Sequence, residues 1–361
     1  MRKILFIAPR FHTNQYYLIK NLMRKNQIYF LSLFKGKTED YKYIKPKIIK
    51  QSYFSLKFQS FLKLRFDTFY FPNFFEYLSI FKEIKPDLII IRTYSRPLLY
   101  ITSVLSKVFK SNIIYYNQSP GLEYSDFTSF LKYLEFNLAK FIFKAAWFSP
   151  ILLKSNNKNS LPFVVKTRKN INQIKGKFKL LMIGKFQKRK NHFLLVNTIK
   201  RLSYIYNIEL TIVGEVSTNE HAKNFNYINN FILKNNLKKN CKIKKNIKFK
   251  EIEKEYFNCN LFILPSHSEP AAISILEAQG YSRPVICSDS CGTKVYLNKS
   301  CSQIFRTNDI NSLANSIKYF LDRKYIYTNF VIRSHQNACK NFSARKFDKD
   351  FIKFMKLNFK K

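Results

Sequence analysis

The chain has 361 residues, an apolar fraction of 46% and a formal net charge of +42 at pH 7. Its length exceeds what one hydrophobic core usually serves, so two domains are expected, and its apolar fraction excludes wholesale disorder. The charge predicts a surface that attracts phosphates, acidic glycans, anionic lipid headgroups or nucleic acid, although abundant Lys, Asn, Ile, Phe and Tyr are also typical of a compositional bias in the source genome.

The first half of the chain alternates short apolar runs with amphipathic stretches. The apolar runs predict strands at residues 3–8, 28–34, 87–94, 112–118 and 145–150. Helices are expected between them, at residues 12–24, 97–109 and 127–143. The first run is too short for the core of a signal peptide. Continuous apolar strands separated by helices are typical of a parallel sheet that is covered on both faces.

A polar stretch rich in Lys and Asn, residues 154–177, is the predicted linker. The pattern of strands and helices then restarts, with strands expected at residues 179–186, 208–215, 247–250, 261–266 and 284–289. The predicted domains are therefore residues 1–165 and 166–342, and a basic amphipathic helix is expected within residues 343–361.

The cysteines and the longest apolar stretch exclude two further classes of protein. All six cysteines lie in the second half, without a C-x-x-C pair, so no zinc or other metal site is expected. Buried, reduced thiols of a cytoplasmic protein are the simplest interpretation. The longest apolar stretch, residues 141–153, is interrupted by Lys144 and Pro150, so no transmembrane helix is expected.

The stretch HSEPAAISILEAQG, residues 267–280, follows the predicted strand 261–266 directly. Ligands of open α/β sheets bind beyond the carboxyl ends of the strands, which is where Glu269 stands. Pro270 suits the first position of a helix, and a helix beginning there predicts an anion site made of free backbone N–H groups. Those amides belong to Ala271, Ala272 and Ile273. Glu277 follows a little over two helical turns after Glu269, near the same face.

A sugar nucleotide is a ligand that would need both features. The start of the helix would bind its diphosphate, and a carboxylate would accept hydrogen bonds from the ribose hydroxyls. The alternative is that Glu269 is an exposed loop acid and Glu277 is an acid on the surface of a helix. Periodicity alone favours that alternative.

The run ILPSHSEPAAISILEAQGYSRPVICSD, residues 263–289, resembles the core motif of retaining family 4 of the GT-B glycosyltransferases. That motif combines a strand, P-S, E-x7-E, E-A and a G-x-P-V-I strand. The matching positions here are Pro265, Ser266, Glu269, Glu277, Ala278, Pro284, Val285 and Ile286. Ser282 stands where the family usually has glycine, and this departure is expected to alter a turn but not the chemistry.

A second run, IGKFQKRKNHFLLVNTIKRL, resembles the first strand-to-helix segment of the second domain in that family. The resemblance implies that Gly184, Lys185 and Lys190 line the site of the donor diphosphate. Lys185 replaces the usual arginine, so a bidentate fork becomes a point charge. The alternative is a solvated basic loop in a chain rich in lysine. Together, the two runs extend the resemblance over residues 179–307.

The resemblance is weak in the first domain. The family's glycine-rich loop is replaced by APRFHTNQYY, from which His12 or Asn14 is expected to face the cleft. Where the family often has a histidine, this chain has Asn-Gln-Ser at 117–119, and Gln118 can donate a hydrogen bond to a sugar hydroxyl but cannot act as a base. Arg92 or Arg96, at the end of another predicted strand, would meet an acidic acceptor or lie on the surface at a helix start.

Residues 53–81 are rich in Phe and Tyr, interleaved with lysine and arginine. They predict either an amphipathic helix in a membrane interface or a first-domain helix whose Phe residues belong to the core. The rival class of function is a nucleic-acid-binding protein without catalytic activity, based on the net charge. Because the basic residues are spread along the chain and no known binding module is present, nucleic acid is not the expected partner.

The resemblance implies an α/β protein with the GT-B fold: two doubly wound Rossmann-like domains facing across a cleft, with the C-terminal helix crossing back to the first. It implies a retaining, hexosyltransferase-like enzyme that moves a sugar from a UDP- or GDP-linked donor to a glycan or lipid-linked acceptor. The pathway would be cell-surface polysaccharide or lipopolysaccharide synthesis. The expected location is the cytoplasm, at the inner face of the cytoplasmic membrane, and neither a metal nor another cofactor is expected.

The resemblance also implies a role for each residue of the donor site. Lys190, Lys185 and the amides at the helix start would stabilise the departing diphosphate, where negative charge develops in the transition state. Glu277 would hold the ribose. Glu269 would contact the transferred sugar or its phosphate side.

Overall fold

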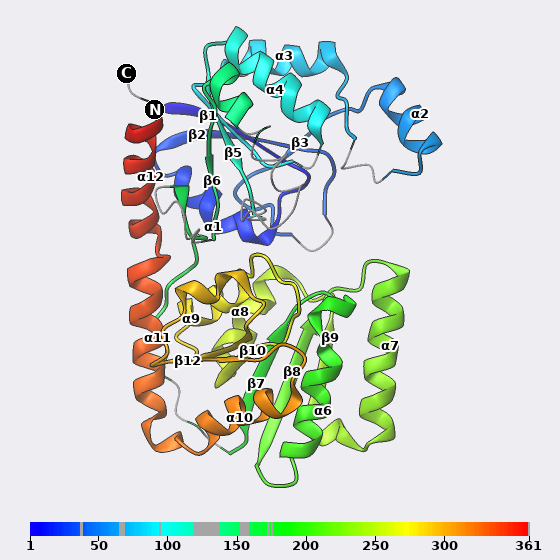
Figure 1. Ribbon diagram of the computed structural model, residues 1–361, viewed down its shortest axis with the longest axis vertical. Coiled ribbons are helices and arrows are strands. Elements are labelled where there is room, and N and C mark those ends of the chain that lie inside the picture. Colours follow the sequence, from blue (N-terminus) through cyan, green and yellow to red (C-terminus); the bar gives the residue numbers. More distant parts are fainter. Residues whose placement is uncertain are drawn as a thin grey trace. The chain divides into compact units, whose positions relative to one another are not determined.

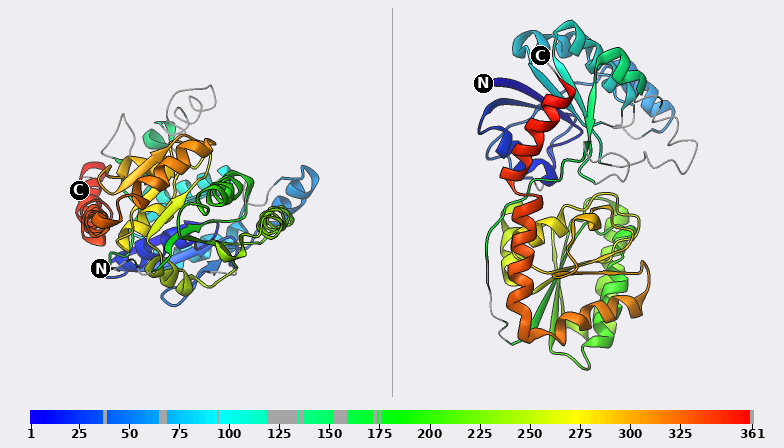
Figure 2. Two further views of the ribbon diagram at one scale, coloured as in Figure 1. Left: turned by 90° about the horizontal axis from the view of Figure 1, so that it is seen from below. Right: turned by 60° about the vertical axis from the view of Figure 1, so that its left-hand side comes forward.

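A computed structural model gives the structure of the chain as two compact units. It describes residues 1–36, 39–64, 69–93, 95–118, 134, 137–151, 159–171, 174 and 176–359. Unit 1 consists of Met1–Leu161 and Lys349–Lys361, and unit 2 of Pro162–Asp348. The last helix, α12 (Ala344–Asn358), therefore begins in unit 2 and ends in unit 1 (Figure 2). The acceptor and donor roles assigned to the two predicted domains stay predictions.

Unit 1 contains a six-stranded parallel sheet in the order β3-β2-β1-β4-β5-β6 (Figure 1). Its strands are β1 (Arg2–Ala8), β2 (Asn26–Ser32), β3 (Lys47–Ile48), β4 (Leu88–Ile91), β5 (Asn112–Tyr116) and β6 (Ala146–Phe148). Its helices are α1 (Thr13–Leu22), α2 (Tyr53–Phe61), α3 (Phe74–Ile84) and α4 (Arg96–Val108). Ile7, Ile91 and Ile113 belong to one buried cluster. Central parallel strands are covered on both faces, so their sequences are continuous apolar runs. The apolar runs therefore predicted this sheet correctly.

Unit 2 repeats the architecture with the order β12-β11-β10-β7-β8-β9. Its strands are β7 (Phe178–Ile183), β8 (Ile208–Gly214), β9 (Cys241–Lys245), β10 (Leu261–Leu264), β11 (Val285–Ser288) and β12 (Ser302–Phe305). Its helices are α6 (His192–Leu202), α7 (Asn219–Lys234), α8 (Phe249–Asn258), α9 (Ser274–Gly280), α10 (Ile310–Leu321) and α11 (Tyr327–Asn341), with a short 3-10 turn, η2 (Lys188–Lys190). None of the helices among the described residues is long and apolar enough to cross a membrane.

One predicted strand differs from the structure, and one predicted helix is described only in part. The strand predicted at residues 247–250 is wrong, because the edge strand β9 ends at Lys245 and Asn246 then turns with φ +55°. The side chain of Asn246 fixes that turn by accepting a hydrogen bond from the Val216 amide at 2.8 Å. The helix predicted at 127–143 falls largely outside the described residues, although 137–143 are helical.

The end of the predicted linker packs along unit 2. The Arg168 amide donates to the Gly280 carbonyl at 2.8 Å, and a Cβ added at Gly280 would lie 2.4 Å from the carbonyl oxygen of Lys166. Ser282 has φ +64°, a conformation that favours glycine, which accounts for the glycine preferred in the resembling family. Its hydroxyl donates to the Arg168 carbonyl and accepts from the Asn170 amide, so the departure from glycine fastens the linker to this turn.

Candidate functional site

Two loops at the carboxyl ends of neighbouring strands build the centre of the site. Strand β7 leads into η2, which carries Arg189 and Lys190, and β10 leads into the loop that carries Glu269. Because β7 and β10 are paired in parallel, residues about eighty positions apart in the chain emerge at the same edge of the sheet. The His267 amide donates to the Arg189 carbonyl at 2.8 Å and joins the two loops directly.

Glu269, Lys190 and Arg189 form a largely buried ion triad. Arg189 Nη1 lies 2.6 Å from Glu269 Oε2, and Lys190 Nζ donates to the same oxygen. Burial raises the pKa of the Glu269 carboxyl, but the charges of Lys190 and Arg189 outweigh it and hold this pKa below its usual value. Burial lowers the pKa of Lys190, and the charge of Glu269 opposes that shift. The triad therefore places two cations beside one anion, with positive charge in excess.

Gly184 and a buried aromatic pair lie beside the turn that carries Lys190. A Cβ added at Gly184 would lie 3.3 Å from Lys190 Cδ, so the glycine leaves room for the lysine stem. His192, at the start of α6, is buried and stacks on Phe186 with 4.7 Å between ring centroids. Its imidazole bonds to the Gly184 backbone, and burial lowers its pKa to about 3. It is therefore a neutral structural group at physiological pH, and the charge nearby comes from the triad.

The helix predicted to begin at Pro270 begins instead at Ser274, so that part of the prediction is wrong. The Glu269 carbonyl accepts from the Gly292 amide at 2.9 Å, and the Ala272 carbonyl accepts from the Thr293 hydroxyl at 2.9 Å. These carbonyls bond to the loop after β11 and are not available to a helical turn. The first helical hydrogen bonds of α9 are accepted by Ile273.

Three backbone amides near the triad remain without an acceptor. They belong to Ala271, Ala272 and Ile273, and within the described part of the chain they donate no hydrogen bond. Ala272 is buried and its two neighbours are half-buried. Irregular backbone with successive free N–H groups can bind an anion without a helix dipole. The predicted anion site thus keeps its three donors although its predicted secondary structure is wrong.

Glu277 lies on α9 in a different environment from Glu269. The Tyr256 hydroxyl donates to Glu277 Oε2 at 3.0 Å and also lies 3.2 Å from the Ser274 carbonyl. Burial raises the pKa of Glu277 to about 7, and the hydrogen bond from Tyr256 opposes this rise. Glu277 is buried, and it forms no ion pair with any residue that the structure describes. Near neutral pH it can switch between donating and accepting hydrogen bonds.

Lys185 lies apart from the triad in another ion pair. It follows β7 and lies 3.2 Å from Glu215, which follows β8. Sequence reasoning placed Lys185 and Lys190 together but missed Arg189, which stands between them in an evident basic run. It also missed Tyr256, because nothing in the local sequence of α8 connects that tyrosine with α9.

The predicted acceptor-side residues lie in unit 1 at the ends of β1, β4 and β5. Asn14 Nδ2 donates to Gln118 Oε1 at 3.1 Å, and Gln118 Nε2 donates to the Tyr116 hydroxyl at 3.0 Å. Burial raises the pKa of Tyr116 to about 12, while the Gln118 bond and the nearby charge of Arg92 oppose the rise. The structure therefore brings Asn14, Gln118 and Arg92 to one region. His12 caps α1, where Gln15 accepts from its amide; Ser119 lies outside the described residues.

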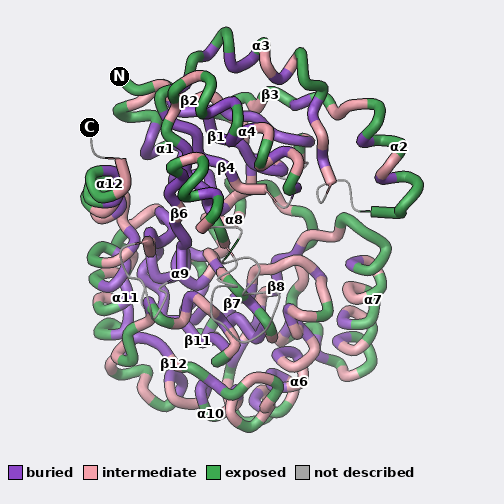
Figure 3. Tube along the Cα trace, turned by 45° about the horizontal axis from the view of Figure 1, so that its top comes forward, coloured by how far each residue is buried: buried purple, intermediate pink, exposed green. Residues whose placement is uncertain are grey.

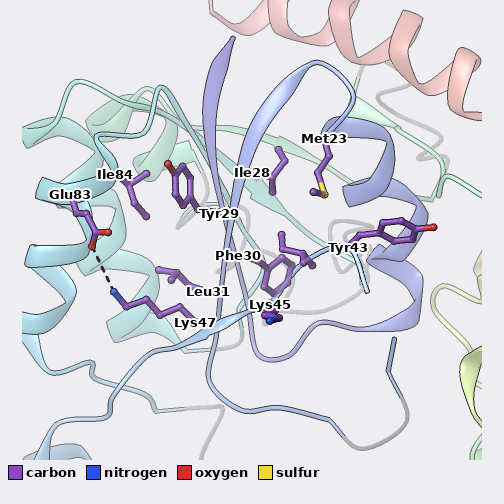
Figure 4. A pocket seen from close by; sticks show the side chains of 11 residues that line it. Met23, Ile28, Tyr29, Phe30, Leu31, Tyr43, Lys45, Lys47, Glu83 and Ile84 are labelled. Carbon is purple, nitrogen blue, oxygen red and sulfur yellow. Dashed lines mark ion pairs between the residues drawn. The ribbon is translucent and has the colours of Figure 1, made fainter. Parts of the chain in front are cut away.

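A separate cavity of about 280 Å³ opens beside the edge of the unit 1 sheet (Figure 4). β3 pairs with Leu31 and Ser32, at the end of β2. The earlier part of β2 therefore borders this space along its edge away from β1. The Lys47–Glu83 ion pair, 3.8 Å long, lies at its margin. The cavity contains none of the residues that the sequence assigned to a site.

Comparisons with known proteins agree with the predicted fold. Residues 164–340 match the family model for glycosyl transferases group 1. Protein CapJ of Staphylococcus aureus is 31% identical over 180 residues, which are 48% of this chain and 43% of CapJ, so the chain spans less than half of that relative. A glycosyltransferase from Rickettsia africae superposes with a TM-score of 0.77 at 16% identity, over 99% of both chains.

A second solved structure has the same fold. Anabaena HepE in complex with UDP-glucose superposes with a TM-score of 0.73 at 11% identity, over 99% of this chain and 100% of HepE. At such identities the likeness concerns the fold alone. With the two parallel sheets described above, it confirms the GT-B fold class that the sequence predicted.

Proposed function

Residues 164–340 belong to the glycosyl transferases group 1 family, and we propose that the protein is a retaining glycosyltransferase of family 4 type, hexosyltransferase-like, with a UDP- or GDP-linked donor. The observation that carries this proposal is the buried triad of Glu269, Lys190 and Arg189 next to the free amides of residues 271–273. Fixed cations and free N–H donors at the carboxyl edge of a parallel sheet fit a diphosphate.

The chemical step would depend on stabilising the leaving diphosphate. As the bond between the sugar and the phosphate breaks, negative charge grows on the phosphate oxygens, and preorganised donors there lower the barrier. Lys190 and Arg189 would supply positive charge, and the backbone amides would orient the diphosphate by donating hydrogen bonds to its oxygens. These cations make a metal ion unnecessary in the scheme. Lys185, paired with Glu215, is proposed as a further diphosphate contact.

The two glutamates would have different roles. Glu269 offsets part of the charge on Lys190 and Arg189, and its charge opposes the lowering of the lysine pKa by burial; we propose that it also faces the transferred sugar. Glu277, as a carboxylate, would accept hydrogen bonds from the ribose hydroxyls. Since its pKa is about 7, donor affinity should rise with pH through neutrality.

The acceptor is proposed to be a glycan or a lipid-linked glycan bound by unit 1. The amides of Asn14 and Gln118 suit sugar hydroxyls, and Arg92 suits an acidic group. The product would enter cell-surface polysaccharide or lipopolysaccharide synthesis. We place the protein in the cytoplasm, at the inner face of the cytoplasmic membrane.

Release of nucleoside diphosphate from a panel of UDP- and GDP-sugars tests the function. With the productive donor, Lys190→Ala should lower kcat by about 10²–10³-fold. Lys188→Ala is the matched control, because Lys188 lies in the same turn but is exposed, and it should retain wild-type turnover. Full activity of Lys190→Ala would contradict the assignment. NMR of the first product's anomeric configuration tests retention.

The rival nucleic-acid function is tested in parallel. Thermal stabilisation by the productive nucleotide-sugar is expected at moderate salt, and single-stranded RNA should give no specific stabilisation. Stabilisation by RNA alone, without release of nucleoside diphosphate from any donor, would favour the non-catalytic alternative.

A further inference from the structure

In helix α2 the buried side chains are polar, whereas most of the aromatic side chains are exposed. Within α2, all of which the structure describes, the buried residues are Ser55 and Gln59, which are four apart and share one side. The Ser55 hydroxyl bonds to the Phe69 carbonyl and the Phe71 amide at 3.1 Å each, and Gln59 Nε2 donates to the Phe69 carbonyl. These polar side chains, together with the half-buried Phe58, whose ring centroid lies 4.6 Å from that of Phe69, attach this helix to unit 1, at whose margin it lies (Figure 3).

The outward side of α2 is aromatic and basic. Tyr53, Lys57 and Phe61 recur every four residues on the side opposite Ser55 and Gln59. Phe61 is 83% exposed and Tyr53 is 71% exposed. The surface formed by Tyr53, Phe54, Leu56, Lys57 and Phe61 is called the α2 patch here. Its lysine ammonium lies 4.7 Å above the Tyr53 ring, so the charge stays at the level of the aromatic side chains.

Further exposed aromatic residues occur at the start of α3. An antiparallel bridge between Gln51 and Pro72 holds the start of α2 beside the start of α3. There Phe74 and Phe75 are exposed, Phe75 at 82%. Water-soluble surfaces rarely expose contiguous apolar areas, and where they do, the area usually contacts a partner. Because hydrogen bonds from Ser55 and Gln59 fix the orientation, the outward aromatics are a feature of the fold.

We propose that the α2 patch docks on an anionic lipid membrane, with its rings at the boundary between headgroups and acyl chains and Lys57 on the lipid phosphates. Aromatic side chains combined with lysine suit that interface, where each side chain has an apolar body and the charge reaches the polar layer. The net charge of +42 adds long-range attraction to an anionic surface. A protein partner would need acidic groups to face Lys57, whereas the membrane supplies charge and apolar depth together.

Co-sedimentation with vesicles tests this assignment. The wild-type protein should bind phosphatidylcholine vesicles that contain phosphatidylglycerol more strongly than pure phosphatidylcholine vesicles. The double variant Phe54→Ser/Phe61→Ser should bind at least about tenfold more weakly, because two exposed rings lose the acyl boundary. The control is Tyr204→Ser/Tyr325→Ser, which removes two equally exposed tyrosines from unit 2, each 82% exposed, and should bind like the wild type. Lys57→Glu should weaken the preference for phosphatidylglycerol.

A fluorescence measurement gives a second readout. Phe61→Trp should show a blue shift of its emission on addition of phosphatidylglycerol vesicles, after subtraction of the wild-type signal from Trp147. Absence of wild-type binding, equal binding by the Phe54→Ser/Phe61→Ser variant, or no shift would overturn the proposal. So would a wild-type dimer that this variant converts to a monomer, since the occupant would then be a second copy of the chain.

This inference deepens the membrane location proposed above and is independent of the glycosyl-transfer chemistry. The patch lies in unit 1, and the triad and the free amides lie in unit 2. Release of nucleoside diphosphate in the absence of vesicles should be the same in Phe54→Ser/Phe61→Ser as in the wild type. A failure of membrane binding therefore leaves the enzymatic proposal intact, and loss of turnover in Lys190→Ala does not bear on membrane binding.

Discussion

Replacing Glu277 by glutamine tests whether a buried carboxyl titrates near neutrality. Burial raises its pKa from the ordinary 4.5 to about 7. The unfolded chain releases this proton at the ordinary pKa, whereas the folded chain keeps it until about pH 7. The carboxyl therefore lowers the free energy of unfolding progressively between those pH values, and by a constant amount above them. At about 1.4 kcal/mol per pKa unit, the full loss is about 3 kcal/mol.

Glu277→Gln removes this titration, so the variant should gain stability relative to the wild type as pH rises. For a unit of this size the change in the difference between their Tm values should be about 6–12 °C between roughly pH 5 and roughly pH 8. Scanning fluorimetry across that range measures it, with Glu220→Gln, an exposed acid on α7, as the control. A Tm difference that stays constant with pH would refute the reasoning. The same variant should lose donor affinity above neutral pH.

Two other substitutions give expectations of known direction. Tyr256→Phe removes the hydrogen bond that lowers the pKa of Glu277, so the pH at which donor affinity reaches half of its maximum should move upward in a binding titration, and stability should fall by about 1 kcal/mol. Glu269→Gln leaves Lys190 buried without an anion, which should lower the pKa of that lysine further. Its kcat should fall by about 10²-fold and recover in part at lower pH, and a pH-independent loss would contradict this role.

The sheets could be predicted from the sequence because central parallel strands are continuous apolar runs. The β9 edge strand was misplaced, since its lysines hide an apolar pattern that Cys241 and Ile243 alone carry. The start of α9 was misplaced for a different reason. Gly292 and Thr293, more than twenty residues away, take the carbonyls of Glu269 and Ala272 that a helix would have used. Local helix propensity takes no account of hydrogen bonds to residues so far away in the sequence.

Part of the candidate site could likewise be predicted from the sequence, and part of it depends on tertiary contacts. Glu269 and Lys190 could be predicted from the resemblance, and the structure brings them into contact. Arg189 was hidden by composition, because one more basic residue in a lysine-rich chain carries little information. For residues 53–81, the sequence allowed two interpretations: a helix of the core or a helix at a membrane interface. Only the tertiary position of Ser55 and Gln59 shows which side of α2 faces outward.

In the proposed donor site, Glu269 would limit which anions can bind. A cell contains many phosphates, and two bare cations in a pocket would retain any of them. Because Glu269 already occupies Arg189 and Lys190, an arriving anion must displace an existing partner, and charge alone brings it little gain. An anion that also reaches the free amides of residues 271–273 makes bonds that Glu269 does not make. In that proposed site, the internal counter-ion would therefore favour a ligand that reaches both the triad and the free amides over one that is merely charged.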